Sequence, residues 1–140
     1  MFCREDPVFT YEIKVSMSYD NGYTWDTARV LTPGTLGPDY VAAFWLEGET
    51  YVVIRQNGNA IVTEDGWETW EEVPTSLPAG MLSFASPTRV NGKLYLPTGD
   101  NGVYASEDGV TWTQVLVPND YGAADDEIFL SSIVIPTGSV

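Results

Sequence analysis

The sequence contains no histidine, one cysteine and only six basic residues, and each shortage excludes something. Without histidine, proton transfer would fall to carboxylates or tyrosines, and no cluster of Cys and His is available for zinc. Cys3 alone cannot form an internal disulfide, so the fold does not depend on one. Six basic residues against twenty acidic ones give a net charge of −14, which argues against nucleic acid or an anionic membrane as a partner.

Long apolar runs and helical periodicity are also missing. No segment is long and apolar enough for a transmembrane helix, and no window repeats its apolar residues at helical spacing. The first residues, MFCREDPVF, lack the basic stretch followed by an apolar one that marks a secretory signal. We therefore expect the protein to be synthesised in the cytoplasm. If it acts outside the cell, we expect it to reach the extracellular medium by lysis, on the surface of a virion.

The sequence does contain a short motif in three copies, which we call the first box (18–25), the second box (63–70) and the shorter third box (106–112). The aspartates of successive boxes are 45 and 43 residues apart, close to the ~40–45-residue period of a four-stranded propeller blade. A flanking segment repeats too, since 48–51 (GETY) is matched 44 residues later by 92–95 (GKLY). The box positions are Ser18, Asp20, Gly22 and Trp25; Thr63, Asp65, Gly66 and Trp70; and Ser106, Asp108, Gly109 and Trp112.

The chemistry of the box predicts a rigid structural turn. An aspartate followed closely by glycine accepts hydrogen bonds from backbone N–H groups just ahead of it, while the glycine supplies a positive φ. The Ser or Thr two residues before the aspartate can hold the start of the turn. The tryptophan at the end brings a large apolar surface between neighbouring sheets. We therefore expect all three boxes to stabilise the fold and to take no part in catalysis.

The boxes resemble BNR or Asp-box repeats, S-x-D-x-G-x-x-W, which occur in sialidases, sortilin-type receptors, photosystem assembly factors and many phage proteins. The first box fits this pattern in full, the second has its glycine one place early and Thr for Ser, and the third lacks one residue. The resemblance covers almost the whole chain. It implies a β-propeller of the sialidase-like superfamily, with each box between the third and fourth strands of a blade and away from the ligand face.

Runs of β-branched and aromatic residues between Gly, Pro and Asn turns predict an all-β fold of four-stranded antiparallel propeller blades. We interpret 1–140 as a single module with blade parts 1–31, 41–73 and 83–117 and a closing strand 127–135. The expected strands are 9–18, 25–31, 41–46, 51–55, 60–63, 70–73, 83–90, 94–97, 103–106, 111–117 and 127–135.

These strands make just under three blades, whereas propellers usually have about four to eight. Two copies could form a six-bladed ring, the chain could belong to a longer one, or an open array could dock on a partner. An unclosed array would expose long strand edges, which soluble proteins avoid. We therefore expect a homo-oligomer or a larger virion assembly.

A sialidase-like hydrolase is the main alternative. Such a site needs an arginine cluster to hold a substrate carboxylate, a tyrosine nucleophile activated by a glutamate, and an aspartate as acid and base. Only Arg4, Arg29, Arg55 and Arg89 are available, and the R-I-P-type motif of the family is absent. A convergence of arginines is conceivable only across assembled protomers, so we expect no catalytic residues.

Aromatic residues in predicted loops are the best binding candidates, because such rings can stack on sugars or anchor a protein interface. They are Tyr19, Tyr23, Tyr40, Trp67 and Tyr121. We expect no cofactor and no metal, since the acidic segment 119–127 lacks the spacing of a calcium loop. The sequence thus favours a noncatalytic module for assembly or binding, decorating a virion or attaching it to a host glycan. A cellular assembly factor is a third possibility.

Overall fold

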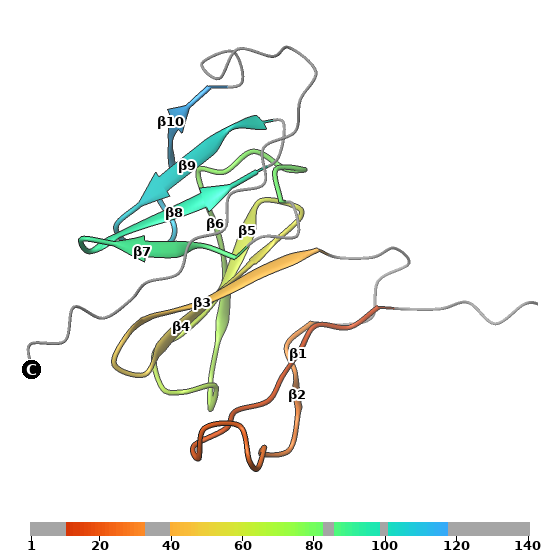
Figure 1. Ribbon diagram of the computed structural model, residues 1–140. Helices are drawn as coiled ribbons and strands as arrows, with labels where there is room; N and C mark the ends of the chain where they lie inside the picture. Colours follow the sequence, from red (N-terminus) through yellow and green to blue (C-terminus); the bar gives the residue numbers. More distant parts are fainter. Residues whose placement is uncertain (1–10, 33–39, 83–85, 99–100, 118–140) are drawn as a thin grey trace, which may run out of the picture. The chain divides into compact units, whose positions relative to one another are not determined.

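The computed structural model describes residues 11–32, 40–82, 86–98 and 101–117. The chain divides into two compact units, Met1–Asp39 and Tyr40–Val140. The regular structure of the described residues consists of ten strands in three antiparallel sheets (Figure 1), and the all-β prediction is confirmed. The described residues contain no helix with the length and hydropathy needed to cross a membrane.

In the first unit, a short antiparallel pair flanks the first box. It consists of β1 (Lys14–Val15) and β2 (Arg29–Val30), so the expected strands 9–18 and 25–31 were too long. Between this pair and the box, the backbone N–H of Asp26 donates to the Met17 carbonyl at 2.9 Å, and the N–H of Met17 donates to the Asp26 carboxylate at 2.7 Å. Residues 9 and 10 lie outside the described part of the chain.

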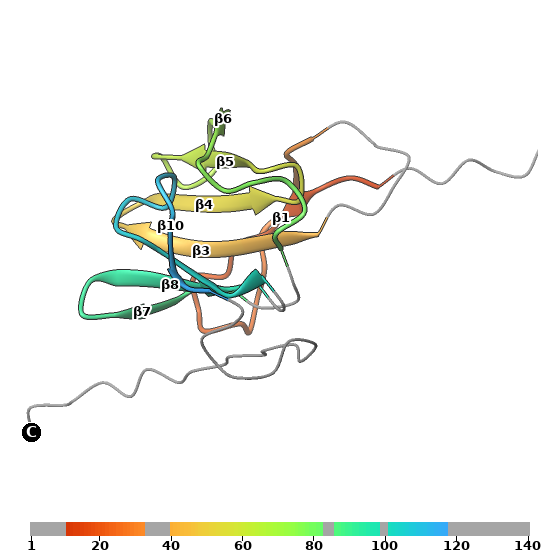
Figure 2. The same ribbon diagram turned by 90° about the horizontal axis from the view of Figure 1, so that it is seen from above.

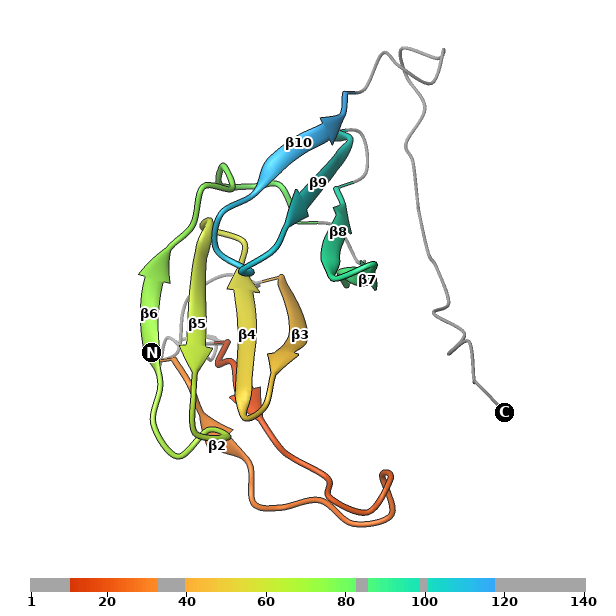
Figure 3. The ribbon, with the colours of Figure 1, turned by 90° about the vertical axis from the view of Figure 1, so that its left-hand side faces the viewer.

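The second unit contains two four-stranded meanders, each in chain order (Figure 3). We call them the first blade and the second blade. The strands of the first blade are β3 (Val41–Glu47), β4 (Thr50–Arg55), β5 (Asn59–Thr63) and β6 (Glu71–Pro74). Those of the second blade are β7 (Thr88–Val90), β8 (Lys93–Pro97), β9 (Val103–Ser106) and β10 (Thr113–Leu116).

The strand bounds predicted for the first blade agree with the structure to within one residue. Of the expected outer strands of the second blade, 111–117 was too long, and residues 86–87 of the expected strand 83–90 are not in a strand, while 83–85 lie outside the described residues. Strand β7 begins only after Pro87, whose missing N–H cannot contribute to a ladder. The expected strand 127–135 lies outside the described residues, as does the acidic segment 119–127.

The strand register shows which residues of the two blades are equivalent. Thr63 of the second box pairs with Tyr51, whereas Ser106 of the third box pairs with Leu94. Tyr51 is therefore equivalent to Leu94 and not to Tyr95, so the match at 44 residues aligns the strands one residue out of step. A register shift between Trp45 and Glu47 absorbs the extra residue of the first blade. Because a one-residue slip exchanges the faces of a strand, this correction decides which side chains face each neighbour.

The two blades pack face to face around a shared apolar core (Figure 2). The core residues are Ala42, Val52, Ile54 and Ala60 of the first blade, Leu77 and Leu82 of the connection, and Leu94, Leu96 and Trp112 of the second blade. The ring of Trp112 meets Phe44 edge-on, with the centroids 6.2 Å apart. The Ser76 hydroxyl donates to the carbonyl of Trp112 at 2.9 Å and accepts from its N–H at 2.6 Å. The third box is thus docked on the blade that precedes it.

Candidate functional site

The first box forms the turn that its chemistry predicts. Asp20 accepts from the backbone N–H of Thr24 at 2.8 Å, from the Thr24 hydroxyl at 2.5 Å and from the Ser18 hydroxyl at 3.0 Å. The N–H of Gly22, at φ 87°, donates to the Ser18 oxygen at 2.7 Å. The Trp25 indole N–H donates to the Gly22 carbonyl at 3.1 Å, which fixes the ring against the turn.

The second box uses the same bonds with a different residue at the glycine position. Asp65 accepts from the N–H and the hydroxyl of Thr69, at 2.9 and 2.5 Å. The N–H that donates to the Thr63 oxygen belongs to Trp67, at 2.9 Å, and Trp67 has a φ of 72°. Trp67 therefore stands where the first box has Gly22. The early glycine of this box, Gly66, also has a positive φ.

The third box closes the turn with one residue fewer. Asp108 accepts from the backbone N–H groups of Val110 and Thr111, at 2.9 and 2.7 Å, and Ser106 donates to it at 3.1 Å. The indole N–H of Trp112 donates to the Gly109 carbonyl at 3.1 Å, as Trp25 does to Gly22. The two tryptophans are thus held in the same way at the ends of their turns.

These bonds favour the ionised form of each box aspartate. The hydroxyl and then the N–H of Thr69 lower the pKa of Asp65 to about 2. The same two groups of Thr24 lower the pKa of Asp20. For Asp108, partial burial raises the pKa, but the N–H groups of Thr111 and Val110 outweigh it and the pKa is lowered overall. Each box carboxylate is occupied by its own turn and is kept ionised, which suits a structural role.

The aromatic binding candidates have different environments. Tyr19 and Tyr23 are 78% and 88% exposed, and Tyr40 is 44% exposed. Trp67 is only 2% exposed, so its expected role as an exposed binding residue was wrong. Its ring stacks on Tyr51 with centroids 6.4 Å apart, because the positive φ turns the side chain inward from the box. Tyr121 lies outside the described residues.

Sequence reasoning missed a depression of about 480 Å³ between the two blades. It is lined by Phe44, Trp45, Pro87, Arg89, Asn91, Gly92 and Leu94. Trp45 lies in β3, so the pattern of the strand did not single it out as a loop aromatic, yet its side chain is 53% exposed. Its indole N–H donates to the Gly48 carbonyl at 2.9 Å, which sets the orientation of the ring.

Arg89 forms the other wall of this depression. One guanidinium nitrogen, Nη2, donates to the carbonyls of Trp45 and Leu46 at 3.0 and 2.7 Å. The guanidinium carbon lies 5.6 Å from the centroid of the Trp45 ring, within the range of a cation–π contact. The nitrogens Nε and Nη1 of Arg89 form no hydrogen bond with another described residue. An aromatic ring and a cation with spare donors are thus held rigidly at one opening.

The arginines of the second unit do not form a common cluster. Arg55 forms an ion pair with Glu72 within the first blade, at the end of β4 remote from Trp45. Arg89 is bound to the carbonyls at the other end of the neighbouring strand β3. Among the described residues, no group of three or more Cys, His, Asp or Glu side chains is arranged to hold a metal ion.

Comparison with curated proteins and with solved structures gave no match. A comparison with protein families matched residues 23–128 to the DUF6242 β-propeller domain. That match spans most of the chain, including both blades of the second unit and the end of the first box. The meander order of the blades and their face-to-face packing agree with it. The chain belongs to the DUF6242 β-propeller domain family.

Proposed function

We propose that this protein is a noncatalytic propeller module that binds a glycan at the depression around Trp45 and Arg89. The observation that carries the proposal is the pairing of a half-exposed aromatic ring with a guanidinium whose Nε and Nη1 donate to no other described residue. The apolar face of a sugar ring can stack on an indole, and a guanidinium can donate to its hydroxyl or carboxylate groups. The amide of Asn91, at the rim, adds a further donor and acceptor.

Rigidity supports this assignment. Trp45 is held by the Gly48 carbonyl, and Arg89 is held by two carbonyls of the first blade. A site whose side chains are already ordered loses less conformational entropy when a ligand binds.

The depression lies at the box end of the strands, since the N–H of Gly66 donates to the carbonyl of Glu49 in the β3–β4 turn at 3.0 Å. The resemblance to Asp-box repeats associates ligands with the other end.

The setting we propose is a virion surface, where the module decorates the particle or attaches it to a host glycan. The resemblance of the three boxes to Asp-box repeats, which occur in phage proteins, supports this setting. The box carboxylates are bound by their own turns, and Arg55 and Arg89 have separate partners. This arrangement supports a binding role over sialidase-like hydrolysis.

A glycan microarray probed with the labelled full chain tests the proposal. We expect Trp45→Ala to reduce binding at least tenfold while the melting temperature changes little, because Trp45 is half exposed. Tyr19→Ala is the matched control, since Tyr19 is an exposed aromatic of the first box and should leave binding unchanged. Loss of binding in the control but not in Trp45→Ala would move the site to the first box, and no binding to any glycan would contradict the function.

The same preparation is incubated with a fluorogenic sialoside. We expect no turnover, because Arg55 and Arg89 of the second unit are held by separate partners. Steady hydrolysis that disappears in Arg55→Ala or Arg89→Ala would make the hydrolase the better assignment.

A further inference from the structure

Six turns of this chain contain an asparagine or an aspartate followed directly by glycine, and all six are among the described residues. Glycine has no Cβ to shield its backbone nitrogen, so in such a pair that nitrogen can attack the side-chain carbonyl carbon of the residue before it. Whether a pair reacts depends on how firmly the turn holds the glycine N–H and the side chain. The residues followed by glycine are Asn21, Asn57, Asn91, Asn101, Asp65 and Asp108.

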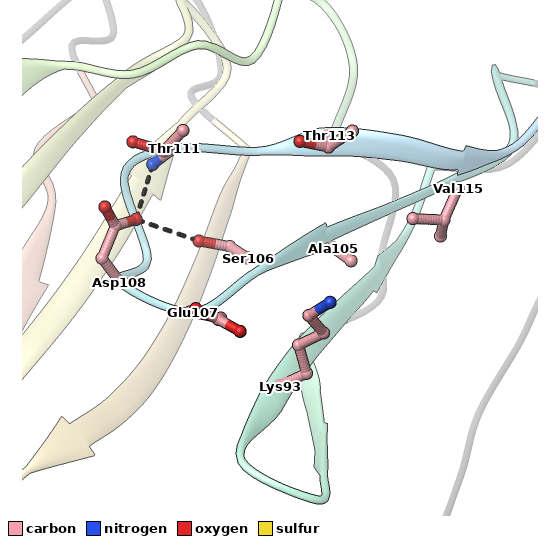
Figure 4. Close-up of a pocket in the computed structure, with 8 residues that line it drawn as sticks. All are labelled: Lys93, Ala105, Ser106, Glu107, Asp108, Thr111, Thr113 and Val115. Carbon is pink, nitrogen blue, oxygen red and sulfur yellow. Dashed lines mark hydrogen bonds between the residues drawn. The ribbon is translucent and has the colours of Figure 1, made fainter.

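The three pairs that belong to the boxes have their glycine N–H groups engaged in hydrogen bonds. The box can hold the side chain as well, and Figure 4 shows the Asp108 carboxylate bonded to the Ser106 hydroxyl and to the N–H of Thr111. A nitrogen attacks through its lone pair after losing its proton, so an N–H that donates a hydrogen bond is a poor nucleophile. The bonds run from Gly22 to the Ser18 oxygen at 2.7 Å, from Gly66 to the Glu49 carbonyl at 3.0 Å and from Gly109 to the Ser106 oxygen at 2.8 Å.

Two further pairs are held by the backbone around them. The N–H of Gly58 donates to the Arg55 carbonyl at 3.0 Å, and the side-chain oxygen of Asn57 accepts from a backbone N–H at 2.9 Å. Gly102 is buried, and a Cβ in its place would collide with a backbone carbonyl. The amide nitrogen of Asn101 donates to another backbone carbonyl at 3.4 Å. Neither pair can rotate into the geometry of attack without breaking these contacts.

The remaining pair, Asn91 and Gly92, has none of these constraints. It forms the turn between β7 and β8 (Figure 1), and both residues have positive φ, at 50° and 78°. Both residues are exposed, and neither the Asn91 side chain nor the Gly92 N–H forms a hydrogen bond with another described residue. A Cβ built on Gly92 would meet no atom within 4 Å beyond its chain neighbours. An exposed turn of this kind opens locally at low cost, so the nitrogen can reach the side chain.

We propose that Asn91 is the position at which this chain deamidates spontaneously. The nitrogen of Gly92 gives its proton to solvent and bonds to Cγ of Asn91. The bond between Cγ and Nδ2 then breaks, and Nδ2 takes up a proton from solvent and leaves as ammonia. Water opens the cyclic imide at either carbonyl, which leaves an aspartate or an isoaspartate at position 91. The balance is one water gained and one ammonia lost, so the reaction requires no oxidant.

The reaction changes the depression around Trp45 and Arg89, because Asn91 and Gly92 are part of its lining. It replaces a neutral amide by a carboxylate in the space that contains the Arg89 guanidinium, whose Nε and Nη1 donate to no other described residue. The new charge repels an acidic ligand and competes with it for the guanidinium. This consequence rests on the proposed glycan function, whereas the reaction itself does not.

Peptide mapping by mass spectrometry tests the proposal. The folded full chain is kept in mildly alkaline buffer and digested with chymotrypsin at intervals, and the mass gain of each Asn–Gly peptide is followed. We expect Asn91 to deamidate at least about fivefold faster than Asn21, Asn57 or Asn101, the factor that corresponds to one hydrogen bond of ordinary net strength. In urea all four should react at similar rates. Equal rates in the folded chain, or a preference for Asn91 that persists in urea, would overturn the proposal.

Ser18→Ala provides a second test, because it removes the acceptor of the Gly22 N–H and lies outside the hairpin of Asn91. We expect deamidation of Asn21 to rise towards the rate of Asn91, while Asn91 keeps its wild-type rate. An unchanged rate at Asn21 would show that the hydrogen bond gives no protection, and the proposal would fail. Asn91→Gln is the control for the assignment and should remove the fast mass gain.

Asn91→Asp reproduces one product of the reaction and tests its effect on the depression. On the glycan microarray this variant should lose binding to carboxylate-bearing glycans by a larger factor than binding to neutral ones. Equal losses for both classes would overturn the effect of charge on the depression. A chain that deamidates at Asn91 but binds no glycan would contradict the glycan function alone, because the peptide map needs no ligand.

Discussion

At the scale of single residues, Trp67 is the position where local backbone preference and packing conflict. Its φ of 72° lies in the left-handed region, which costs a residue with a Cβ roughly 1–2 kcal/mol. Burying the side chain of a large apolar residue contributes about 1.5–3 kcal/mol, which offsets that cost. The ring is 2% exposed and stacks on Tyr51. Packing therefore keeps a tryptophan where the first box uses glycine.

This conflict predicts an unusual order of stability at position 67. Trp67→Ala should lower the free energy of unfolding by about 3–5 kcal/mol, the usual cost of removing a buried indole. Trp67→Gly should cost about 1 kcal/mol less than Trp67→Ala, because glycine adopts a positive φ without strain. Urea denaturation of both variants measures the difference.

The control is Ala43→Gly in β3, a strand position without a positive φ. There glycine should destabilise the protein by about 0.5–1 kcal/mol relative to alanine. If glycine were the worse residue at position 67 as well, backbone strain would not be the feature that distinguishes this site.

At the scale of secondary-structure elements, Arg89 joins the inner strands of the two blades. From β7 it donates to two carbonyls at the end of β3, and it covers part of the Trp45 ring. These carbonyls belong to Trp45 and Leu46, where the register between β3 and β4 shifts. Arg89 therefore supplies hydrogen-bond donors at the point where the β3–β4 ladder is irregular.

Truncation of this side chain should loosen the contact between the blades. We expect Arg89→Ala to lower the free energy of unfolding by about 1–3 kcal/mol, the usual cost of leaving partly buried polar groups unpaired. Arg89→Lys should lie between the wild type and the alanine variant, because an ammonium keeps the charge but not the planar fork. Thermal denaturation followed by circular dichroism measures both.

Lys93→Ala in the same hairpin is the control. Lys93 is exposed, so its removal should change the free energy of unfolding by no more than about 0.5 kcal/mol. Equal losses in Arg89→Ala and Lys93→Ala would mean that the hairpin as a whole responds to charge and that the two carbonyl contacts are unimportant.

At the scale of the whole molecule, acid has two opposing effects. At neutral pH the net charge is −14, so the carboxylates repel one another. Protonation of exposed carboxylates relieves this repulsion as the pH falls. The box aspartates act in the other direction. Their pKa values are lowered in the folded protein, so the stability they provide is present above the ordinary pKa of an aspartate and is lost as the pH falls through the lowered values.

We therefore expect the melting temperature to rise or hold steady from pH 7 to about 5, and to fall steeply between about pH 4 and 2. The lower limit follows from Asp65, whose pKa is lowered to about 2. Asp65→Asn should show a shallower fall across that interval, because an amide does not titrate. Differential scanning calorimetry across the pH series measures this, and identical slopes for the variant and the wild type would contradict a role for Asp65 in acid unfolding.

The sequence by itself determined the all-β class, the positions of most strands in the second unit and the hydrogen bonds of the boxes. These features depend on residues that are close together in sequence. An aspartate accepts hydrogen bonds from the N–H groups a few residues ahead, and a run rich in β-branched residues favours a strand whatever its neighbours in space. The sequence also places a tryptophan at the end of each box. It could not predict how far each tryptophan is covered.

Only the tertiary structure decided the features that depend on residues distant in sequence. Trp67 is buried because Tyr51 stacks on it, and Trp45 joins a depression because Arg89 approaches it from another strand. The register shift in the β3–β4 hairpin changed which face of each strand meets its neighbour, although the sequence match at 44 residues suggested otherwise. An extra residue in a hairpin leaves the sequence pattern of strand and turn residues unchanged. Which side chains lie on each face of a blade is therefore decided by the hydrogen bonds between its strands.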